Sequence, residues 1–432
     1  MGFIRSVIWM VLVAIFSIIL SFFFRDSSPP QLYAGYVEPG FEAVEHEFRK
    51  NFETGYEAGG AAFSVCYKGK MVVDLWGGYA DKAALRPWTE NTLSTAFSST
   101  KGVAALCIAH LVDRGHIKYS DLVTKYWPEF GANGKDNVTV KMLLGHEAGL
   151  ALLDEPITKE AVKNWRLMSK LFEKQVPNWP PGTTAGYHVI TFGFIVDQLI
   201  RRVDPKHRSV GQYFREEIAE PHGIDFYIGL PRDQLYRVAR LTDPTAWDYL
   251  IRFDDWEFVK FFANLLLRHG NELTKKTMSN PEWLHMLDKY NPFNDPDIQE
   301  MEIAGGGGIG NARALARLFC LLGDEKTPLV RKSVLDIIAE PAIATPSDVI
   351  LGMNLTWGHG FMHRKSPNGH YQLGHPGYGG QNVKFDRNEN VAFAYIRNSV
   401  SPEFVGELVR TFRHLENALY DSIRAIKKVD FS

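Results

Sequence analysis

Segments with the pattern of β-strands lie near both ends of the chain, with helical patterns between them. The strand-like runs are residues 61–67, 71–78, 349–361, 371–375, 380–386 and 391–398. Lys68-Gly69-Lys70 separates the first two runs and Asp386–Asn390 separates the last two, so each pair is expected to form a β-hairpin. Because hairpins this far apart both need to bury an apolar face, the sequence predicts one sheet assembled from both ends of the chain.

Helical patterns account for much of the remaining sequence. Apolar residues recur at helical spacing in residues 41–52, 98–114, 190–202 and 403–427. Residues 203–300 are rich in Trp and Asp and have no pattern that defines their elements. We therefore expect an α/β (α+β) fold, in which an antiparallel sheet is flanked by terminal helices and carries an inserted helical region.

Composition places the chain among ordinary globular proteins. Its 432 residues are 45% hydrophobic and 23% charged, which is enough for a sizeable core. The formal net charge of −2 gives no general basic character. Since nucleic-acid binding usually needs a basic face, we expect no nucleic-acid partner.

An uncharged apolar run extends from Ser6 to Phe24, between Arg5 and Arg25. A helix needs about 20 apolar residues to cross a bilayer, so this run is long enough. A cleaved signal peptide is the alternative, but its apolar region is usually about 7–15 residues long and is followed by small residues. This run ends in three phenylalanines and a charged pair, which favours an uncleaved anchor.

The anchor implies an organisation and a location for the chain. The expected parts are a membrane anchor at 1–25, a Pro-containing linker at 26–40 and one soluble domain at 41–428. Arg5 and the amino terminus outweigh Arg25, which has Asp26 beside it, so the amino end is expected in the cytoplasm. Glycosylation sequons at Asn137 and Asn354 suit a lumenal or extracellular soluble domain. The expected localisation is therefore a single-pass membrane protein of this orientation, in contact with the membrane through residues 6–24.

The three cysteines, Cys66, Cys107 and Cys320, are far apart in sequence, and each has apolar neighbours. An odd and unclustered set does not indicate a disulfide framework or a Cys-based metal site. We therefore expect three buried free thiols, which behave as small hydrophobic side chains.

Ser98-Ser99-Thr100-Lys101 matches the pattern S-x-x-K at the start of the helix expected at 98–114. Ser98 would lie beside free backbone N–H groups, and Lys101 would return to the same side of the helix. A serine hydroxyl is a weak nucleophile until a neighbouring base takes its proton, and a lysine can do this if burial lowers its pKa. By itself the motif is short, and an N-cap serine with an unrelated lysine would match it equally well.

Longer sequence motifs support the interpretation that Ser98 and Lys101 are catalytic. The chain resembles the serine β-lactamase, penicillin-binding protein and family VIII carboxylesterase superfamily over nearly all of its soluble part. The resemblance is closest to the esterase-like branch and to animal proteins with a β-lactamase domain. The matching phrases, in family order, are LWGGYADKAALRPWTENTLSTAFSSTKG, LVDRGHI, VTKYWPEF, VKMLLGHEAGL, PPGTTAGYHVITFGFIV and LGHPGYGGQNVKFD.

The resemblance implies a β-lactamase/transpeptidase-like fold and roles for particular residues. Ser98 would be acylated, Lys101 would accept its proton, and Tyr187 in the phrase GYH would exchange protons with the nucleophile and leaving group. A tyrosine near a buried lysine would let each group favour the other's charged form. No metal and no cofactor is expected.

The segment His375-Pro376-Gly377 would stand in the place of the family's K-T-G triad, on the edge strand of the sheet. The backbone N–H groups of Ser98 and Tyr378 would then form the oxyanion hole, because such donors stabilise the charge of the tetrahedral state. Gly377, like the neighbouring glycines, would let the substrate approach the backbone closely.

Two departures from the family pattern bear on the substrate. His375 replaces a lysine that would offer a fixed cation, and it is largely neutral at pH 7. The asparagine of the usual Y-x-N motif is also missing, since residue 189 is Val. Both changes favour neutral carboxylic esters or amides over β-lactams and peptidoglycan.

Two other patterns have plainer interpretations than ligand sites. Gly305–Gly310 contains G-x-G-x-x-G, but no βαβ unit surrounds it, so we expect a loop before a helix from Arg313. His359 and His363 have the spacing of a helical zinc pair, but their segment reads as a strand with glycines. His146 in GHEAGL is expected to shape a loop near the cleft.

Two functions fit the sequence. The first is a serine hydrolase that forms an acyl-enzyme on Ser98, with a peptidase, transacylase or β-lactamase activity still open within that class. The second is a membrane-tethered structural or binding protein that keeps the fold with little turnover. The complete set of Ser98, Lys101 and Tyr187 favours the first.

Overall fold

In the computed structural model, the described residues are 16, 30–260, 263, 272–284, 291–345, 347–403, 406 and 408–430. Apart from Phe16, the anchor expected at residues 6–24 lies outside them. Among the described residues, no helix is both long and apolar enough to cross a bilayer. The expected limits of anchor, linker and soluble domain stay predictions.

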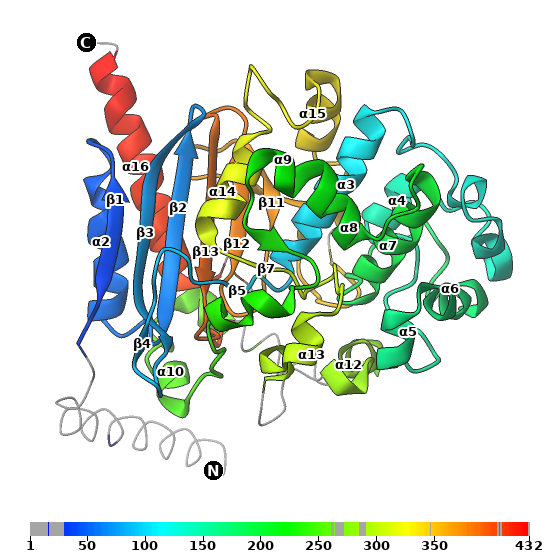
Figure 1. Ribbon diagram of the computed structural model, residues 1–432, viewed down its shortest axis with the longest axis horizontal. Helices are drawn as coiled ribbons and strands as arrows, with labels where there is room; N and C mark the ends of the chain where they lie inside the picture. Colours follow the sequence, from blue (N-terminus) through cyan, green and yellow to red (C-terminus); the bar gives the residue numbers. More distant parts are fainter. Residues whose placement is uncertain are drawn as a thin grey trace, which may run out of the picture.

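The centre of the molecule is a ten-stranded antiparallel sheet (Figure 1). Its strands run in the order β1-β3-β2-β13-β12-β11-β10-β9-β8, and β4 pairs with β3 beside this path. Their bounds are β1 Tyr33–Val37, β2 Gly60–Tyr67, β3 Lys70–Asp81, β4 Arg86–Pro87, β8 Ile343–Thr345, β9 Leu355–Gly358, β10 Phe361–Lys365, β11 Tyr371–Pro376, β12 Asn382–Asp386 and β13 Val391–Arg397. Both expected hairpins are confirmed, as β2–β3 and β12–β13.

The two ends of the chain meet where β13 pairs with β2. Phe63 lies opposite Tyr395, and Ala61 lies opposite Arg397. Both strands are buried along their whole length. This pairing confirms that one sheet is built from the first and last parts of the soluble chain.

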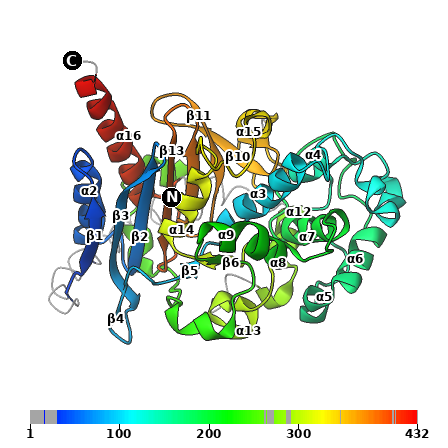
Figure 2. The same ribbon diagram turned by 45° about the horizontal axis from the view of Figure 1, so that its top comes forward.

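Helices cover both faces of the sheet, which explains why its central strands are apolar on both sides. The terminal helices α2 (Glu42–Glu53) and α16 (Arg410–Asp430) pack on one face, and their buried side chains form one core with β2, β3 and β13. Helices α3 (Ser99–Asp113) and α14 (Ala312–Cys320) cover the other face and belong to a larger core. Figures 1 and 2 show this three-layer arrangement.

The inserted helical region lies beyond α3, on the side away from the terminal helices (Figure 2). Its helices, together with those that follow before the last strands, are α4 Val140–Leu144, α5 Lys159–Lys163, α6 Trp165–Lys174, α7 Thr191–Val203, α8 Val210–Phe214, α9 Glu220–His222, α10 Ala246–Leu250, α12 Glu272–Ser279, α13 Pro296–Gln299 and α15 Lys332–Ala339. A small sheet of β5 (Ser94–Thr95), β7 (Ile309–Gly310) and β6 (Phe226–Tyr227) joins this region to the large one.

Helix α16 begins later than the sequence pattern predicts. The expected helix started near Glu403, whereas the observed helix starts at Arg410. The carboxylate of Glu403 accepts the backbone N–H of Arg410 at 3.2 Å and forms a buried ion pair with Arg252 at 2.9 Å. Glu403 therefore serves the first turn from outside the helix.

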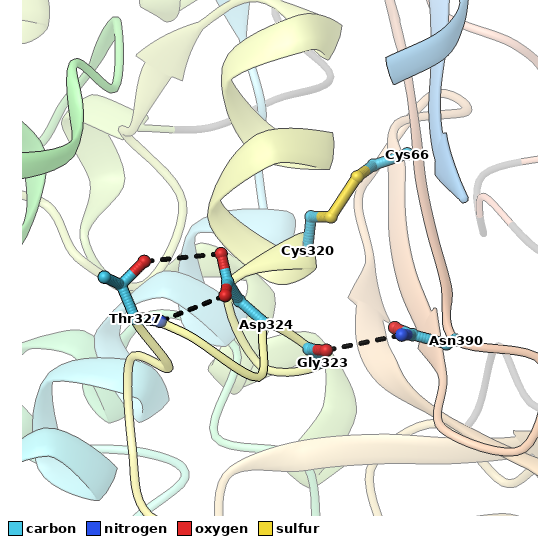
Figure 3. The surroundings of a disulfide bond; sticks show 6 residues. All are labelled: Cys66, Cys320, Gly323, Asp324, Thr327 and Asn390. Carbon is cyan, nitrogen blue, oxygen red and sulfur yellow. Dashed lines mark hydrogen bonds between the residues drawn. A yellow bond between two sulfur atoms is a disulfide. The ribbon is translucent and has the colours of Figure 1, made fainter. Parts of the chain in front are cut away.

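The expectation of three free thiols is wrong for two of the cysteines. Cys66 on β2 and Cys320 at the end of α14 form a disulfide (Figure 3). Cys107 alone is a buried free thiol. The two partners are separated by 254 residues, so their spacing carried no signal. They meet because α14 packs directly on the sheet, where Asn390 also donates to the carbonyl of Gly323 at 3.3 Å.

The disulfide is expected to stabilise the fold through the unfolded state. Replacing both Cys66 and Cys320 with Ala should lower the free energy of unfolding by about 2–4 kcal/mol, because the cross-link closes a very long loop. Denaturant unfolding of the wild type and the double variant would measure this loss. Cys107→Ala is the control for thiol removal. An equal stability of wild type and double variant, or two titratable thiols at Cys66 and Cys320, would contradict the assignment.

Candidate active site

Ser98 lies at a sharp transition from strand to helix. Strand β5 ends at Thr95, Phe97 has a left-handed backbone with φ of 43°, and α3 begins at Ser99. The Ser98 side chain makes no capping hydrogen bond to the helix, and it is only partly buried. Its hydroxyl is therefore presented at the start of α3, as the S-x-x-K pattern predicts.

The two residues inside the motif fix this turn to its surroundings. Ser99 donates from Oγ to the carbonyl of His375 at 2.9 Å, which joins α3 to the end of β11. Thr100 donates from Oγ1 to the carbonyl of Phe97 at 2.6 Å and accepts the N–H of Gly308 at 3.0 Å. The S-x-x-K pattern alone does not show that Ser99 and Thr100 hold the turn in place while the Ser98 side chain is left accessible.

Lys101 is fully buried and points toward the nucleophile. Its Nζ lies 3.2 Å from Ser98 Oγ, 2.6 Å from the carbonyl oxygen of Val189 and 2.5 Å from that of Gly305. Burial alone holds the pKa of Lys101 well below its usual range. The direction is the one that a lysine base requires.

Three oxygen atoms surround the Nζ of Lys101, so they match the three N–H groups of an ammonium, and the neutral amine that burial favours fits them as well. A neutral amine has two N–H groups and one lone pair. When the carbonyls of Val189 and Gly305 accept both N–H groups, the lone pair is left for the hydroxyl of Ser98. In this arrangement Ser98 donates to Lys101, which is the geometry for removing its proton.

Tyr187 completes a compact group around Ser98. Its hydroxyl lies beside the Ser98 side chain, which acts to lower the pKa of Tyr187, and the Nζ of Lys101 lies 4.8 Å from its ring centroid. The ring stacks on Trp357 at a centroid distance of 5.5 Å and on His375 at 5.9 Å. The structure therefore brings together all three residues proposed as catalytic.

The backbone around Tyr187 is held at three successive N–H groups. Gly186 donates to the carbonyl of His146 at 3.0 Å, and His188 donates to Nδ1 of the same residue at 3.2 Å. Between them, Tyr187 donates to the buried carboxylate of Asp348 at 3.1 Å. His146 thus shapes the loop beside the site, as expected, and Asp348 is a positioning residue that the sequence analysis missed.

One electrostatic expectation is reversed. Burial raises the pKa of Tyr187 above its usual value, although its hydrogen bond to Ser98 acts in the opposite direction. Tyr187 and Lys101 were expected to favour each other's charged forms, but burial dominates and shifts the pKa of each group toward its neutral form. The apolar surroundings of Tyr187 explain this result, since they include Ala185 and Val189.

His375 cannot replace the cation of the K-T-G triad. It is buried, its Nδ1–H donates to the carbonyl of Pro376 at 2.7 Å, and burial holds its pKa well below the usual value. Its Nε2 has no hydrogen-bond partner among the described residues. The side chain is therefore neutral at physiological pH, which agrees with the expectation from the sequence.

The strand that carries His375 is not an edge strand. Strand β11 lies inside the sheet, between β10 and β12, whereas an edge strand was expected. Its pairing with β10 extends only to Gly374, while His375 and Pro376 pair with β12 alone. The end of β11 is thus a local edge, and it is this end that lies beside Ser98.

Gly377 and Tyr378 follow this local edge. A Cβ atom on Gly377 would lie 2.5 Å from the carbonyl oxygen of Ala96, so only glycine fits there without displacement. Tyr378 is partly exposed, and its ring meets that of Phe97 edge-on at 5.3 Å. The segment just before Ser98, residues 96–97, therefore contacts the segment that follows β11, residues 377–378.

The Gly-rich segment 305–310 contributes to the site, although not as a nucleotide loop. It runs through turns into β7 and then to α14, which confirms the expected loop before a helix. Its first carbonyl binds Lys101, and a Cβ atom on Gly193 of α7 would lie 1.9 Å from the nitrogen of Gly305. The sequence could not identify this role because it belongs to a backbone carbonyl.

The remaining candidates for ligand binding are structural. His359 lies in the turn between β9 and β10, and His363 lies on β10, so the pair has no helical spacing. Within the described part of the chain, no three His, Cys, Asp or Glu side chains are grouped so that they could hold a metal ion.

Comparisons with known proteins agree with this geometry. The family model described as "Beta-lactamase" matches residues 48–418. The esterase/beta-lactamase LipL of Mycobacterium tuberculosis is 32% identical over 374 residues, which cover 84% of this chain and 82% of that protein. A family VIII carboxylesterase structure has a TM-score of 0.78 at 30% identity, covering 90% of this chain and 99% of the other. A penicillin-binding protein homologue from Caulobacter crescentus has a TM-score of 0.75 at 32% identity, with the same coverage.

The fold and these relatives define a serine hydrolase of the carboxylesterase-like type. The chain belongs to the β-lactamase family.

Proposed function

We propose that this protein hydrolyses neutral carboxylic esters or amides through an acyl-enzyme on Ser98. The observation that carries the proposal is the position of Lys101, whose Nζ lies 3.2 Å from Ser98 Oγ while two backbone carbonyls accept its N–H groups. The lone pair of a neutral Lys101 is then directed at the serine hydroxyl, so that one group is poised to accept the proton as Ser98 attacks.

Opposite pKa shifts suggest separate roles for the two ionisable groups. Neutral Lys101 takes the proton of Ser98 as Oγ attacks the substrate carbonyl carbon. Tyr187 stays protonated because burial raises its pKa, so it donates its proton to the leaving oxygen or nitrogen and regains one from Lys101. Water then attacks the acyl-enzyme, and the same groups return the proton to Ser98. The backbone N–H groups of Ser98 and Tyr378 would stabilise the oxyanion.

Two features support neutral substrates. His375 is buried and neutral, so it offers no cation to a substrate carboxylate. Val189 has no side-chain amide, and its carbonyl is already used by Lys101. Placing a charged substrate group against these residues would leave that charge unpaired, which is costly in a buried site.

Substrate screening of wild type and Ser98→Ala tests this proposal. The panel consists of short-chain esters, acyl-peptides and a chromogenic cephalosporin. We expect turnover of the neutral esters that disappears in Ser98→Ala, with little or none on the cephalosporin. Turnover that is equal in the two proteins, or no turnover of any substrate, would contradict the proposal and favour a binding role.

The pH dependence should report the ionisation of Lys101. Protonated Lys101 has no lone pair for the Ser98 proton, so kcat/KM should fall as the pH falls through the pKa of this lysine. Since burial lowers that pKa, the acid limb should lie well below the ordinary lysine value of about 10.4. A pH profile of kcat/KM on a non-ionising ester measures this limb. A limb centred near pH 10 would contradict a neutral Lys101.

We also propose that residues 6–24 anchor the chain in a membrane, with the hydrolase domain lumenal or extracellular. Two observations support this side of the membrane. The Cys66–Cys320 disulfide suits an oxidising compartment. Asn137 and Asn354 of the two sequons are both exposed. Sensitivity of both asparagines to a peptide N-glycosidase, on protein from intact cells, would support the orientation. Labelling of the hydrolase domain by a cytosolic biotin ligase would contradict it.

A further inference from the structure

We propose that the end of the sheet that carries Ser98 faces the bilayer, and that the ester substrate is a neutral lipid taken from that bilayer. This inference rests on the proposed hydrolase activity and on the proposed anchor at residues 6–24. It adds a docking surface and a class of substrate to them.

The continuous described chain begins, at Pro30, at the same end of the sheet as the active site. The strand register places Tyr33, Ala61, Arg397, Asn382 and Pro376 at one end of β1, β2, β13, β12 and β11. The described chain enters at this end, beside Tyr33. The active site lies at the same end, because Pro376 follows directly on His375.

Two hydrogen bonds place the strand-to-helix turn of Ser98 at this end as well. Ser94 donates from Oγ to the carbonyl of Arg397 at 3.1 Å, and Ser99 donates to the carbonyl of His375 at 2.9 Å. Because β1 and β11 are five strand spacings apart, the chain entry and Ser98 are separated by about 25 Å across the end of the sheet.

The connection between the proposed anchor and the domain is short. The Tyr79 hydroxyl donates to the carbonyl of Pro30 at 2.9 Å, and Gly78 donates to that of Leu32 at 2.8 Å, so the domain holds the chain from Pro30 onward. The six residues from Arg25 to Pro30 can span at most about 20 Å. This end of the sheet is therefore kept near the membrane surface.

Large apolar side chains are exposed at the end of the sheet that carries Ser98. Tyr236 is 76% exposed, Trp256 is 68% exposed and Leu85, at the tip of the β3–β4 hairpin, is 60% exposed. We call these three residues the apolar fringe. Tyr and Trp are the side chains enriched where proteins meet a membrane surface.

Contacts with the sheet hold the fringe in position. Arg86, next to Leu85, donates to the carbonyls of Tyr236 and Val238 at 3.2 and 2.6 Å. Four residues before Trp256, Arg252 donates to the carbonyl of Tyr56, in the loop that precedes β2, at 2.9 Å. Strand β4 follows Leu85 and helix α10 precedes Trp256, and both appear at the bottom of Figure 1.

The position of the site at this end of the sheet and the chemistry of its residues together indicate a class of substrate. A site that lies beside the bilayer receives molecules that dissolve in it, and the site has a neutral His375 and an apolar wall of Tyr187 and Trp357. A neutral acyl ester with a long chain meets both conditions, since it needs no cation and gains from leaving water. The geometry points to uncharged lipid esters such as diacylglycerols.

A fluorescence experiment tests the docking surface without using activity. The full chain is reconstituted in phosphatidylcholine nanodiscs after labelling Trp256→Cys or Ile337→Cys with an environment-sensitive dye. Ile337 is the matched control, because it is 44% exposed on α15, at the opposite end of the sheet, where Asp336 pairs with Arg387 of the β12–β13 turn. We expect brominated lipid to quench the dye at position 256 and not at 337. Equal quenching at both positions, or none at 256, would overturn the docking surface.

Hydrolysis assays then test the substrate class. Each protein is given a diacylglycerol in phosphatidylcholine vesicles and, separately, p-nitrophenyl butyrate in solution. Leu85→Glu, Tyr236→Glu and Trp256→Glu, singly and together, should reduce vesicle hydrolysis, by about tenfold or more for the triple variant, because they remove apolar contact with the bilayer. Turnover of the soluble ester should stay nearly unchanged, and Ile337→Glu should affect neither reaction.

The two proposals fail in different ways. If wild type hydrolyses the soluble ester through Ser98 but the fringe variants match it on vesicles, the bilayer inference is wrong and the proposed function stands. If no Ser98-dependent hydrolysis of either ester occurs, the substrate inference fails together with the proposed function, while quenching at position 256 still decides the docking surface.

Discussion

Lys101→Met is expected to reduce kcat/KM by about 10³- to 10⁴-fold while the protein stays folded. The variant keeps a long apolar side chain in the buried space beside Ser98 but removes the only group within hydrogen-bond distance that can take the serine proton as a neutral amine, among the described residues. Steady-state kinetics on a neutral ester would measure the loss. Because Lys101 takes the proton of Ser98 in the transition state, the fall in kcat/KM should come from kcat and not from KM.

Lys135→Met is the matched control for this variant. Lys135 is also buried, donates to the carbonyls of Glu173 and Gln175, and has a pKa lowered to about 8 by burial. Both substitutions leave two carbonyls without their donor, which costs about 1–3 kcal/mol of stability each. Only the variant at Lys101 should lose activity. Similar kinetics for the two variants would show that the loss follows from destabilisation and not from a missing base.

Tyr187→Phe is expected to reduce kcat/KM by about 10²-fold on esters with a poor leaving group. The ring would keep its stacking on Trp357 and His375, while the hydroxyl beside Ser98 is lost. Since Tyr187 is proposed to protonate the leaving group, esters of acidic phenols should be much less affected. A series of esters with leaving groups of increasing pKa would measure this dependence.

Tyr213→Phe provides the corresponding control. The Tyr213 side chain is buried, and its hydroxyl is bonded to Nδ1 of His110 at 2.8 Å, away from Ser98. This variant should lose some stability through an unpaired histidine but change kcat/KM by less than about threefold. If Tyr187→Phe shows the same loss for every leaving group, Tyr187 positions Ser98 and does not act as the acid.

Local patterns in the sequence were enough to predict that Ser98, the proposed nucleophile, lies at the start of a helix. The expected helix at 98–114 agrees with the observed Ser99–Asp113 to within one residue at each end, because its apolar repeat is long and regular. The two hairpins were predicted equally well, since polar turns separate alternating runs. The family phrases then indicated how these parts assemble, and the fold agrees.

Features that depend on distant backbone groups could not be predicted. The carbonyls of Val189 and Gly305 hold Lys101, but any residue type supplies a carbonyl, so no letter in the sequence marks them. The Cys66–Cys320 disulfide depends on the packing of α14 against β2, so no local sequence pattern predicts it.

The direction of the pKa shift at Tyr187 required the structure for a different reason. Proximity to a lysine suggested a lowered pKa, but the sign depends on whether burial or charge dominates. Burial is the largest influence at both residues, and it raises the pKa of Tyr187 while it lowers that of Lys101. Both shifts favour the uncharged forms, which is consistent with neutral substrates.

The identity of the nucleophile is tested most directly by covalent labelling. The folded wild-type protein is incubated with a fluorophosphonate and its intact mass and peptide map are recorded beside those of Ser98→Ala and Ser99→Ala. We expect a single adduct on Ser98 in wild type, none in Ser98→Ala and a retained adduct in Ser99→Ala, because the hydroxyl of Ser99 donates to the carbonyl of His375. Equal labelling of wild type and Ser98→Ala, or an adduct on another residue, would contradict it.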